Sequence, residues 1–143
     1  DDYFIIHLMK PARMPEVKIT LKASYLMCEN EPRFVLHGTE GSYVKYGLDP
    51  QEADLTKGML PDTPHWGEED ESQWGILHTE TDGNVVRKPY PTLPGNYAAF
   101  YENIYQHIRN GAVLQSDACG VLGVIRLIEA AWESSRTGNV IKL

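Results

Sequence analysis

The stretch EVKITLKASYLMC, residues 16–28, carries apolar and polar side chains in alternation. A period of two is typical of a strand with one buried face, whereas a helix would distribute these apolar side chains around its axis. The pattern therefore predicts a long strand, which must lie in a sheet because an isolated strand leaves its backbone groups unpaired. The other face of the strand carries hydroxyl side chains with Lys18 and Lys22, and we expect it to meet solvent or a second protein surface.

Shorter elements flank this strand on both sides. Residues 3–9 are apolar and predict a first strand, which a turn at 11–15 returns into the long strand as an antiparallel partner. Downstream, residues 33–37 and 42–46 predict two short strands around the loop Gly38-Thr39-Glu40-Gly41, where glycine allows the positive φ angles of a tight hairpin. Four antiparallel strands in succession predict a meander.

The middle of the chain predicts a short helix, a loop and a hairpin. Asp49-Pro50-Gln51-Glu52 has the composition of a helix start, with a capping side chain, proline at the first helical position and a Glu that can reach back to the cap. Residues 59–75 are rich in proline, glycine and acid and predict an excursion loop, and we expect its acidic run at 68–71 to be a solvated loop tip. Residues 76–80 and 84–87 flank an Asp-Gly pair and predict a hairpin.

Two long helices are expected near the end of the chain. Apolar residues recur at helical spacing through residues 97–108, and Gly111 is placed to end this helix. A second apolar stripe runs through residues 118–132, in a helix that Ser116 is expected to cap and Gly138 to end. Both helices therefore have one face that needs a packing partner.

Strands that come first and long helices that follow them predict an α+β fold. The expected architecture is a mostly antiparallel, open-faced β-sheet with helices packed on one face, and residues 140–143 are expected to add a last strand. A length of 143 residues is that of one domain. Residues 1–143 are therefore expected to form a single domain with its own core.

Composition narrows the class of protein. Hydrophobic residues make up 42% and charged residues 23% of the chain, and no apolar run approaches the length of a membrane span, so we expect a soluble globular protein. A net charge of −7 argues against nucleic-acid binding, which requires clustered Lys and Arg. Cys28 and Cys119 show neither a disulfide framework nor metal-ligand spacing, so we expect reduced, buried thiols and a cytoplasmic location.

The sequence contains no motif that carries a named reaction. None of the twelve glycines forms a G-x-G, and the five histidines lack the spacing of a local zinc site. No nucleophile elbow occurs, and we assign no catalytic, cofactor-binding or metal-binding residue. Trp66 and Trp74 flank the acidic run, and two interpretations stay open: they line a ligand site or subunit interface, or they pin the loop to the sheet.

Three segments resemble a known family. They are FVLHGTEGS at 34–42, the stretch at 97–111 and IEAAWESSRTG at 128–138. In this order they resemble the C-terminal α/β domain of the Gfo/Idh/MocA oxidoreductases, and the resemblance covers nearly the whole chain. It implies a glyceraldehyde-3-phosphate dehydrogenase-like C-terminal domain, which agrees with the α+β sheet expected from the patterning.

The resemblance also implies a function. Members of the family are NAD(P)-dependent dehydrogenases that act on sugars, inositols and related polyols. Their N-terminal Rossmann domain holds NAD or NADP and supplies a lysine in a Glu-Lys-Pro segment, while the C-terminal domain contributes substrate contacts and forms homo-oligomers through its open sheet face. No Glu-Lys-Pro occurs here, and the chain starts at Asp1, after the helix that carries the family's catalytic Asp and His. We therefore expect part of a longer oxidoreductase, inactive alone and without a cofactor site of its own.

Part of the substrate wall is expected to remain in this chain. In similar proteins an aromatic residue near the start of the penultimate helix approaches the substrate, and Tyr97, with Asn96, lies at about that place. Arg33, at the end of a strand turn, is a further polar candidate. The alternatives are a core position for Tyr97, which belongs to the apolar stripe, and an ordinary surface position for Arg33.

Two other functions stay open at this point. The chain is alternatively a stand-alone protein-interaction module that binds a partner through its open sheet face. An independent one-domain enzyme would need ionisable groups that converge on the open face, where the sequence places only Lys18 and Lys22.

Overall fold

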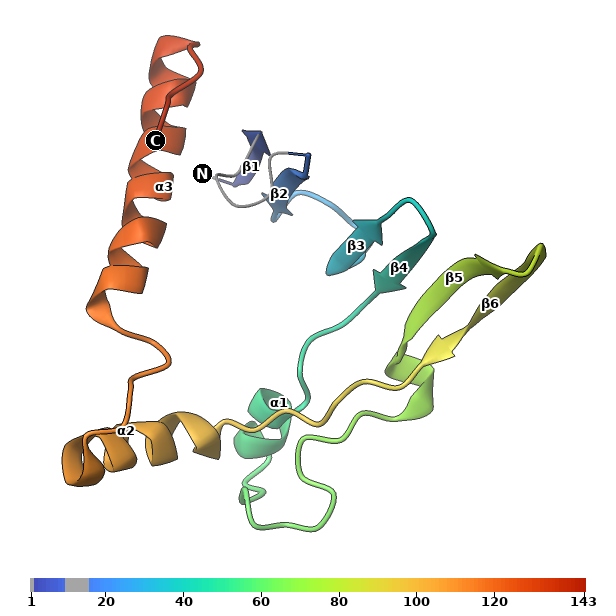
Figure 1. The fold of residues 1–143 in the computed structure, drawn as a ribbon, viewed down its shortest axis with the longest axis vertical. Helices are drawn as coiled ribbons and strands as arrows, with labels where there is room; N and C mark the ends of the chain where they lie inside the picture. The colour runs from blue at the N-terminus through green and yellow to red at the C-terminus, as the bar shows by residue number, and fades with distance from the viewer. Residues whose placement is uncertain (1, 10–15) are drawn as a thin grey trace. The chain divides into compact units, whose positions relative to one another are not determined.

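A computed structural model describes residues 2–9 and 16–143 (Figure 1). Contacts along the chain divide it into two units. One unit draws on residues 1–30 and 115–143, the other on residues 31–114. The first unit contains β1 (Tyr3–Met9), β2 (Lys18–Ser24) and α3 (Ala118–Thr137). The second unit contains β3 (Phe34–His37), β4 (Gly41–Lys45), α1 (Gln51–Thr56), the short 3₁₀ helix η1 (Glu71–Gln73), β5 (Gly75–Thr81), β6 (Asn84–Tyr90) and α2 (Ala98–Asn110). These elements confirm the α+β class with antiparallel strands.

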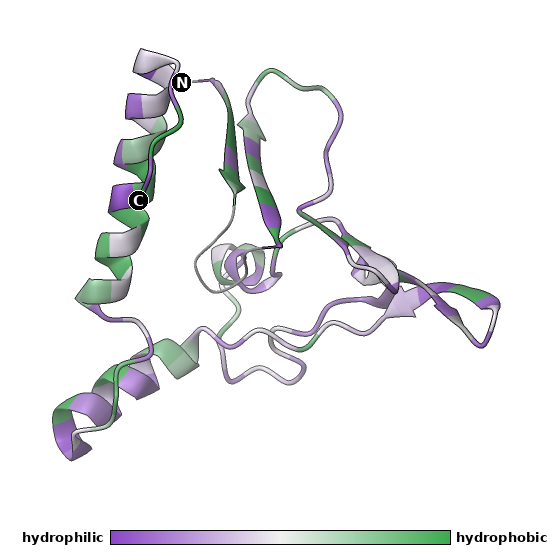
Figure 2. Ribbon diagram, turned by 45° about the horizontal axis from the view of Figure 1, so that its top comes forward, coloured by the Kyte–Doolittle hydropathy of each residue, from purple (hydrophilic) through white to green (hydrophobic). Residues whose placement is uncertain are grey.

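The first two strands form an antiparallel hairpin, as predicted. Figure 2 shows the alternation of apolar and polar residues along β2 as bands of different colour. The ladder ends at Ser24 and does not reach residue 28, so the prediction made the strand too long. The Ser24 hydroxyl accepts the N–H of Leu26 at 3.0 Å, which takes this backbone group away from the ladder. The expected turn at 11–15 lies outside the described residues.

The second unit holds a four-stranded antiparallel meander in the order β3-β4-β5-β6. The prediction of a meander that starts at the first strand was therefore wrong, because residues 25–33 separate β2 from β3 without forming a strand. The hairpin between β5 and β6 is confirmed and is longer than predicted. Its turn residues Asp82 and Gly83 have φ angles of 52° and 74°, which suit a tight hairpin turn.

Both long helices end where the sequence predicted. Gly111 and Gly138 follow α2 and α3 with φ angles of 68° and 71°, the left-handed conformation that glycine adopts without strain. The cap of α3 differs from the prediction, because Asp117 rather than Ser116 occupies the capping position. Its carboxylate accepts the N–H of Gly120 at 2.8 Å.

Replacing Asp117 with alanine is expected to destabilise the protein by about 1 kcal/mol, the usual cost of losing a side-chain helix cap. The free energy of unfolding in urea, followed by circular dichroism on the full-length protein, measures this loss. Ser116→Ala removes the hydroxyl that the sequence pattern indicated and leaves the Asp117 cap in place, so it is the matched control. An equal loss in both variants would contradict the assignment of the cap.

Among the described residues, no apolar side chain is buried. The apolar stripes of α2 and α3 are visible in Figure 2, and their exposed side chains include Phe100, Ile108, Val121, Ile125 and Trp132. Apolar faces of this extent are expected to be covered by another part of the protein or by a second molecule. The buried side chains are instead the polar ones of Lys45 and Gln51.

Two further expectations were wrong. Cys28 and Cys119 are free, but both are exposed rather than buried. Cys28 lies beyond the end of β2, and Cys119 lies off the apolar stripe in the first turn of α3. Residues 140–143 form no strand, and the preceding Asn139 carbonyl accepts the Ser134 hydroxyl of the last helical turn at 2.7 Å. No helix in the described part of the chain is long and apolar enough to span a membrane.

Candidate functional site

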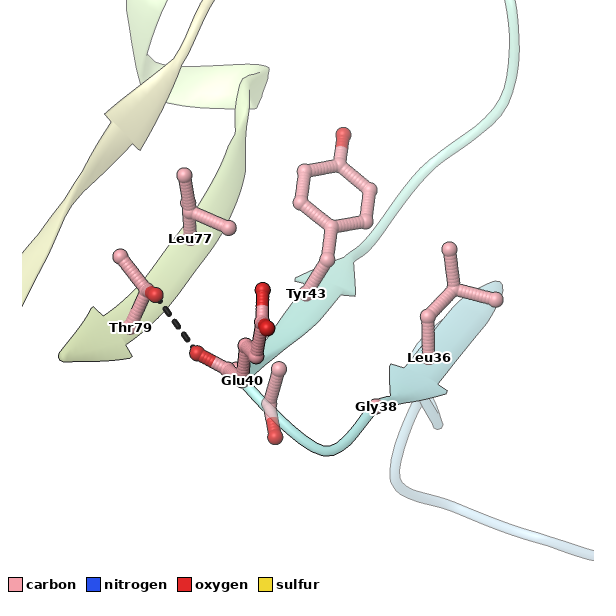
Figure 3. Close-up of a pocket in the computed structure, with 8 residues that line it drawn as sticks. Leu36, Gly38, Glu40, Tyr43, Leu77 and Thr79 are labelled. Carbon is pink, nitrogen blue, oxygen red and sulfur yellow. Dashed lines mark hydrogen bonds between the residues drawn. The ribbon is translucent and has the colours of Figure 1, made fainter. Parts of the chain in front are cut away.

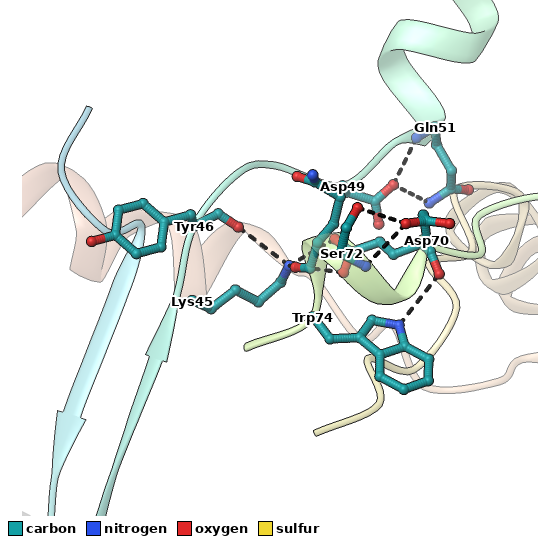
Figure 4. Close-up of polar contacts among 9 residues, drawn as sticks. Lys45, Tyr46, Asp49, Gln51, Asp70, Ser72 and Trp74 are labelled. Carbon is teal, nitrogen blue, oxygen red and sulfur yellow. Dashed lines mark hydrogen bonds and ion pairs between the residues drawn. The ribbon is translucent and has the colours of Figure 1, made fainter. Parts of the chain in front are cut away.

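Gln51, the first residue of α1, is fully buried and joins three separate segments of the second unit. Its Oε1 accepts two hydrogen bonds of 2.8 Å, one from the indole Nε1 of Trp66 and one from the backbone N–H of Tyr97. Its Nε2 donates to Oδ1 of Asp49 at 2.9 Å, as does its own backbone N–H. Figure 4 shows the contacts between Gln51 and Asp49. We call Asp49, Gln51, Trp66, the backbones of Gly67 and Gly95, and the backbone N–H of Tyr97 the Gln51 cluster.

Two glycines let these segments approach closely. The N–H of Gly95 donates to the carbonyl oxygen of Gly67 at 3.1 Å. A Cβ on Gly67 would overlap the carbonyl oxygen of Gly95, and a Cβ on Gly95 would overlap the Asp49 carboxylate and the Gln51 amide. Glycine is therefore required at both positions by the close approach of backbone and side chains.

The predicted substrate-lining residues Asn96 and Tyr97 lie at the start of α2, where the backbone N–H of Tyr97 belongs to this cluster. The side-chain oxygen of Asn96 accepts the N–H of Ala99 at 3.0 Å, so Asn96 caps the helix. The backbone N–H of Tyr97 is bonded to Gln51, while 43% of the residue's surface is exposed. Its role as a substrate contact and the alternative of a core position both stay predictions.

The third predicted site residue lies elsewhere in the second unit. Arg33 precedes β3, and its guanidinium lies 5.9 Å from the centre of the Phe34 ring, a cation–π contact. No described hydrogen bond or ion pair joins Arg33 to Asn96 or Tyr97. Asn96 and Tyr97 are neighbours in the sequence at the start of α2, and Arg33 lies before β3 in the same unit.

A buried ion pair holds the long loop between α1 and β5 against β4. The Lys45 ammonium lies 2.8 Å from both carboxylate oxygens of Glu69 and also donates to the carbonyl oxygens of Tyr46, at 3.3 Å, and Gln73, at 3.0 Å (Figure 4). The side chains of Lys45 and Glu69 are 11% and 5% exposed. The expectation that the whole acidic run is a solvated loop tip was therefore wrong for Glu69.

The tryptophans that flank the acidic run fix the loop through polar contacts. Trp66 reaches Gln51 in α1, and Trp74 donates its indole N–H to the carbonyl oxygen of Glu69 at 3.3 Å. The interpretation that both tryptophans pin the loop to the sheet is not supported by these hydrogen bonds, because their partners lie in α1 and in the loop itself. Their alternative role at a ligand or subunit surface stays untested.

Asp70, the next acidic residue, caps the short helix η1. The Ser72 hydroxyl, at 2.6 Å, and then the Ser72 N–H, at 3.0 Å, donate to its carboxylate and lower the pKa of Asp70 below the usual 3.8. Because the pKa is lower in the folded protein, the contribution of this cap is present above the usual pKa and is lost as the pH falls through the folded value.

Ser72→Ala is expected to raise the pKa of Asp70 towards 3.8, because the largest contribution to its lowering is the hydroxyl hydrogen bond. An NMR titration of side-chain carboxyl shifts in the full-length protein, from about pH 6 to about pH 2, covers the range in which aspartates titrate. Ser24→Ala, at a serine whose described partner is a backbone N–H, is the control and leaves this titration in place. An unchanged Asp70 midpoint in Ser72→Ala would contradict the assignment.

The face of the four-stranded sheet carries a depression of about 290 Å³. Figure 3 shows Leu36, Tyr43 and Leu77 along it, and these residues oppose one another across β3, β4 and β5. The hydroxyl of Thr79 donates to the carbonyl oxygen of Glu40 at 2.6 Å at one end. The surface that lines this depression is mainly apolar.

Sequence reasoning missed Gln51 and Lys45. Gln51 was assigned to a helix start by its spacing from Asp49, and glutamine is usually exposed, so nothing in the pattern indicated burial. The available signals were indirect: Lys45 lies in a predicted strand, and Gly67 and Gly95 lie next to Trp66 and Asn96 in the sequence.

Comparison with known proteins adds the family. The model of the oxidoreductase family C-terminal alpha/beta domain, GFO_IDH_MocA_C, matches residues 1–143. The chain is 38% identical over 114 residues to scyllo-inositol 2-dehydrogenase (NADP(+)) IolW of Bacillus subtilis, which covers 80% of this chain and 32% of that protein. It is 35% identical over 156 residues to the uncharacterized oxidoreductase C115.03 of Schizosaccharomyces pombe, covering 100% of this chain and 42% of that protein.

Solved structures agree with the sequence relatives. A crystal structure from Bacteroides fragilis, of a protein described as a candidate oxidoreductase, superposes with a TM-score of 0.93 at 57% identity and covers 100% of this chain. This chain spans 42% of that protein's length. An oxidoreductase from Bacillus cereus superposes with a TM-score of 0.78 at 32% identity, over 92% of this chain and 38% of that one. The chain therefore belongs to the Gfo/Idh/MocA oxidoreductase family and corresponds to its C-terminal α/β domain.

Proposed function

We propose that this chain is the substrate-binding and oligomerisation part of an NAD(P)-dependent oxidoreductase that acts on a sugar, an inositol or a related polyol. The observation that carries the proposal is the 38% identity to an enzyme named as an NADP-dependent scyllo-inositol dehydrogenase. The chain spans 32–42% of the relatives it matches, so the activity belongs to the longer protein, whose cytoplasmic location is part of the proposal.

The described residues do not fit a dinucleotide themselves. Pyrophosphate commonly binds at a helix N-terminus behind a glycine-rich turn. At the N-terminus of α3 the Asp117 carboxylate already accepts the Gly120 N–H, and its negative charge would repel a phosphate. At the start of α2, the N–H groups of Tyr97 and Ala99 are bonded to the side-chain oxygens of Gln51 and Asn96. We therefore assign NAD or NADP to another domain of the parent protein.

The role proposed for this chain is to shape the substrate pocket. A polyol presents many hydroxyl groups, which amide and phenol side chains can bind as donors and acceptors. Asn96 and Tyr97 supply these groups on a fixed backbone, and the Tyr97 side chain is accessible. Arg33, immediately before β3, is retained as a secondary contact.

A fluorescence titration of NADPH tests whether the cofactor binds to another domain of the parent protein rather than to residues 1–143. The full-length protein is expected to bind NADPH and to oxidise scyllo-inositol with NADP⁺, while residues 1–143 alone bind neither cofactor form. Micromolar binding of NADPH by residues 1–143 alone would refute the assignment. A full-length protein that binds NADPH and oxidises or reduces none of the inositols and sugars tried would refute the substrate class.

We also propose that the protein forms homo-oligomers through an open face of the sheet. The exposed apolar side chains of β3, Phe34 to Leu36, and the apolar depression beside them support this proposal. Successive strand residues point to opposite faces, so Val35→Glu and Leu36→Glu place the same charge on the two faces. We expect one of the two variants, still folded by circular dichroism, to dissociate in light scattering. Dissociation of neither variant, or a monomeric wild type, would refute the proposal.

A further inference from the structure

The Gln51 cluster is more elaborate than a helix start requires. The first turn of a helix has N–H groups without intrahelical partners, and a local side chain usually accepts one of them. For α2, Asn96 performs this task locally. The N–H of Tyr97 is accepted instead by Gln51, which lies 46 residues away in the sequence and is fully buried.

The orientation of the Gln51 amide is determined by its neighbours. Its Nε2 faces the Asp49 carboxylate, an acceptor, and its Oε1 faces the donors of Trp66 and Tyr97. A flipped amide would place donors against donors and oxygen against oxygen in a buried site, at the cost of unsatisfied polar groups. Gln51 is therefore held in one orientation, with its oxygen at the start of α2.

We propose that Gln51 is a positioning residue that fixes the start of α2, and through it Asn96 and Tyr97, at the substrate pocket. This inference rests on the proposed function, which places these two residues in the pocket wall. The backbone of Tyr97 is anchored while 43% of the residue's surface stays accessible, which is the arrangement that a preorganised contact needs. Trp66 shares the same oxygen and ties the loop to the same point.

The test compares three variants in the full-length protein. Gln51→Met keeps the length of the side chain but removes both acceptor contacts. Gln51→Glu keeps an acceptor oxygen for Trp66 and Tyr97 and loses the donor to Asp49. Trp74→Phe removes one indole hydrogen bond from the same loop without touching Gln51, because Trp74 donates to Glu69, so it controls for a general loosening of the loop.

Two measurements are made on each variant. In Gln51→Met we expect hydrogen exchange of the Tyr97–Phe100 amides to rise by about tenfold or more, because the opened N–H loses its buried acceptor. We expect the KM for scyllo-inositol to rise by about tenfold or more through misplacement of the pocket wall, with the Kd of NADPH unchanged. Trp74→Phe should leave both values near those of the wild type.

Gln51→Glu is expected to restore the wild-type KM in a pH-dependent way. Two carboxyl groups at the Asp49–Gln51 distance of 2.9 Å share one proton, which they hold more readily at lower pH. We expect its KM to approach the wild-type value as the pH is lowered from about 8 to about 6, while the KM of Gln51→Met stays high.

The outcomes separate this inference from the proposed function. Unchanged amide exchange at 97–100 in Gln51→Met overturns the positioning role whatever the substrate is. Raised exchange with an unchanged KM also overturns it, because the start of α2 would then not affect the pocket. If the wild-type protein binds NADPH but converts no polyol, the proposed function is rejected, and the pocket role of Gln51 is rejected with it. Whether Gln51 anchors the start of α2 is decided separately, by the amide exchange.

Discussion

Replacing Lys45 with methionine in the full-length protein is expected to lower the free energy of unfolding by about 3–5 kcal/mol, because the change leaves a buried carboxylate without its partner. Glu69 is 5% exposed at its side chain, and the Lys45 ammonium contacts both of its carboxylate oxygens at 2.8 Å. The same ammonium also satisfies two backbone carbonyls, those of Tyr46 and Gln73. Methionine fills a similar volume but supplies no donor to any of these groups.

The matched control is Lys57→Met. Lys57 also pairs with a carboxylate, that of Asp54 at 3.0 Å, but its side chain is 67% exposed. Exposed pairs contribute about 0–1 kcal/mol, so the same substitution should cost little there. Urea unfolding monitored by circular dichroism gives both values. Similar losses in the two variants would contradict the argument that burial makes the Lys45–Glu69 pair important.

A second comparison separates the charge from the loop geometry. Glu69→Gln in the Lys45→Met background removes the stranded charge, so we expect the double variant to be more stable than Lys45→Met alone. The losses of unfolding free energy caused by Lys45→Met and Glu69→Gln would then be non-additive, as expected for residues in direct contact. A double variant that loses the sum of the two single losses would show that the groups do not interact.

The parts of the fold that the sequence predicted correctly are those set by local chemistry. The glycines after α2 and α3 adopt the left-handed conformation that ends a helix, and the Asp-Gly pair makes the turn of the β5–β6 hairpin. Each of these outcomes depends on a few adjacent residues. The end of β2 and the cap of α3 were placed wrongly, because several neighbouring residues could serve and side-chain hydrogen bonds decided between them.

The polar interactions of the second unit could not be predicted in this way. Lys45 and Glu69 are 24 residues apart, and Gln51 and Tyr97 are 46 residues apart. Sequence periodicity reports which face of an element is apolar and not which distant polar groups meet. A buried glutamine is indistinguishable by type from an exposed one, so only the fold reveals that Gln51 satisfies two donors. The family resemblance did indicate the start of α2, which is the place the Gln51 cluster fixes.

Replacing Gly67 with alanine is expected to destabilise the protein by about 2–5 kcal/mol, the sum of two separate costs. Gly67 has a φ of +74°, a conformation that costs an L-residue about 1–2 kcal/mol. A Cβ there would also overlap the carbonyl oxygen of Gly95, and overpacking of this kind costs about 1–3 kcal/mol. The obstructing atom belongs to backbone, so it cannot move aside as the end of a flexible side chain can.

Gly58→Ala isolates the first of these costs. Gly58 has a similar φ of +82°, but a Cβ built there meets nothing within 4 Å. We therefore expect a loss of about 1–2 kcal/mol for Gly58→Ala and a clearly larger loss for Gly67→Ala in the same urea unfolding measurement. Gly67→Ala should also raise amide exchange at 95–97, because the new methyl group pushes against the segment that Gly67 and Gln51 hold. Equal losses in the two variants would mean that the contact between Gly67 and Gly95 is looser than the structure shows, and that the start of α2 is held by Gln51 alone.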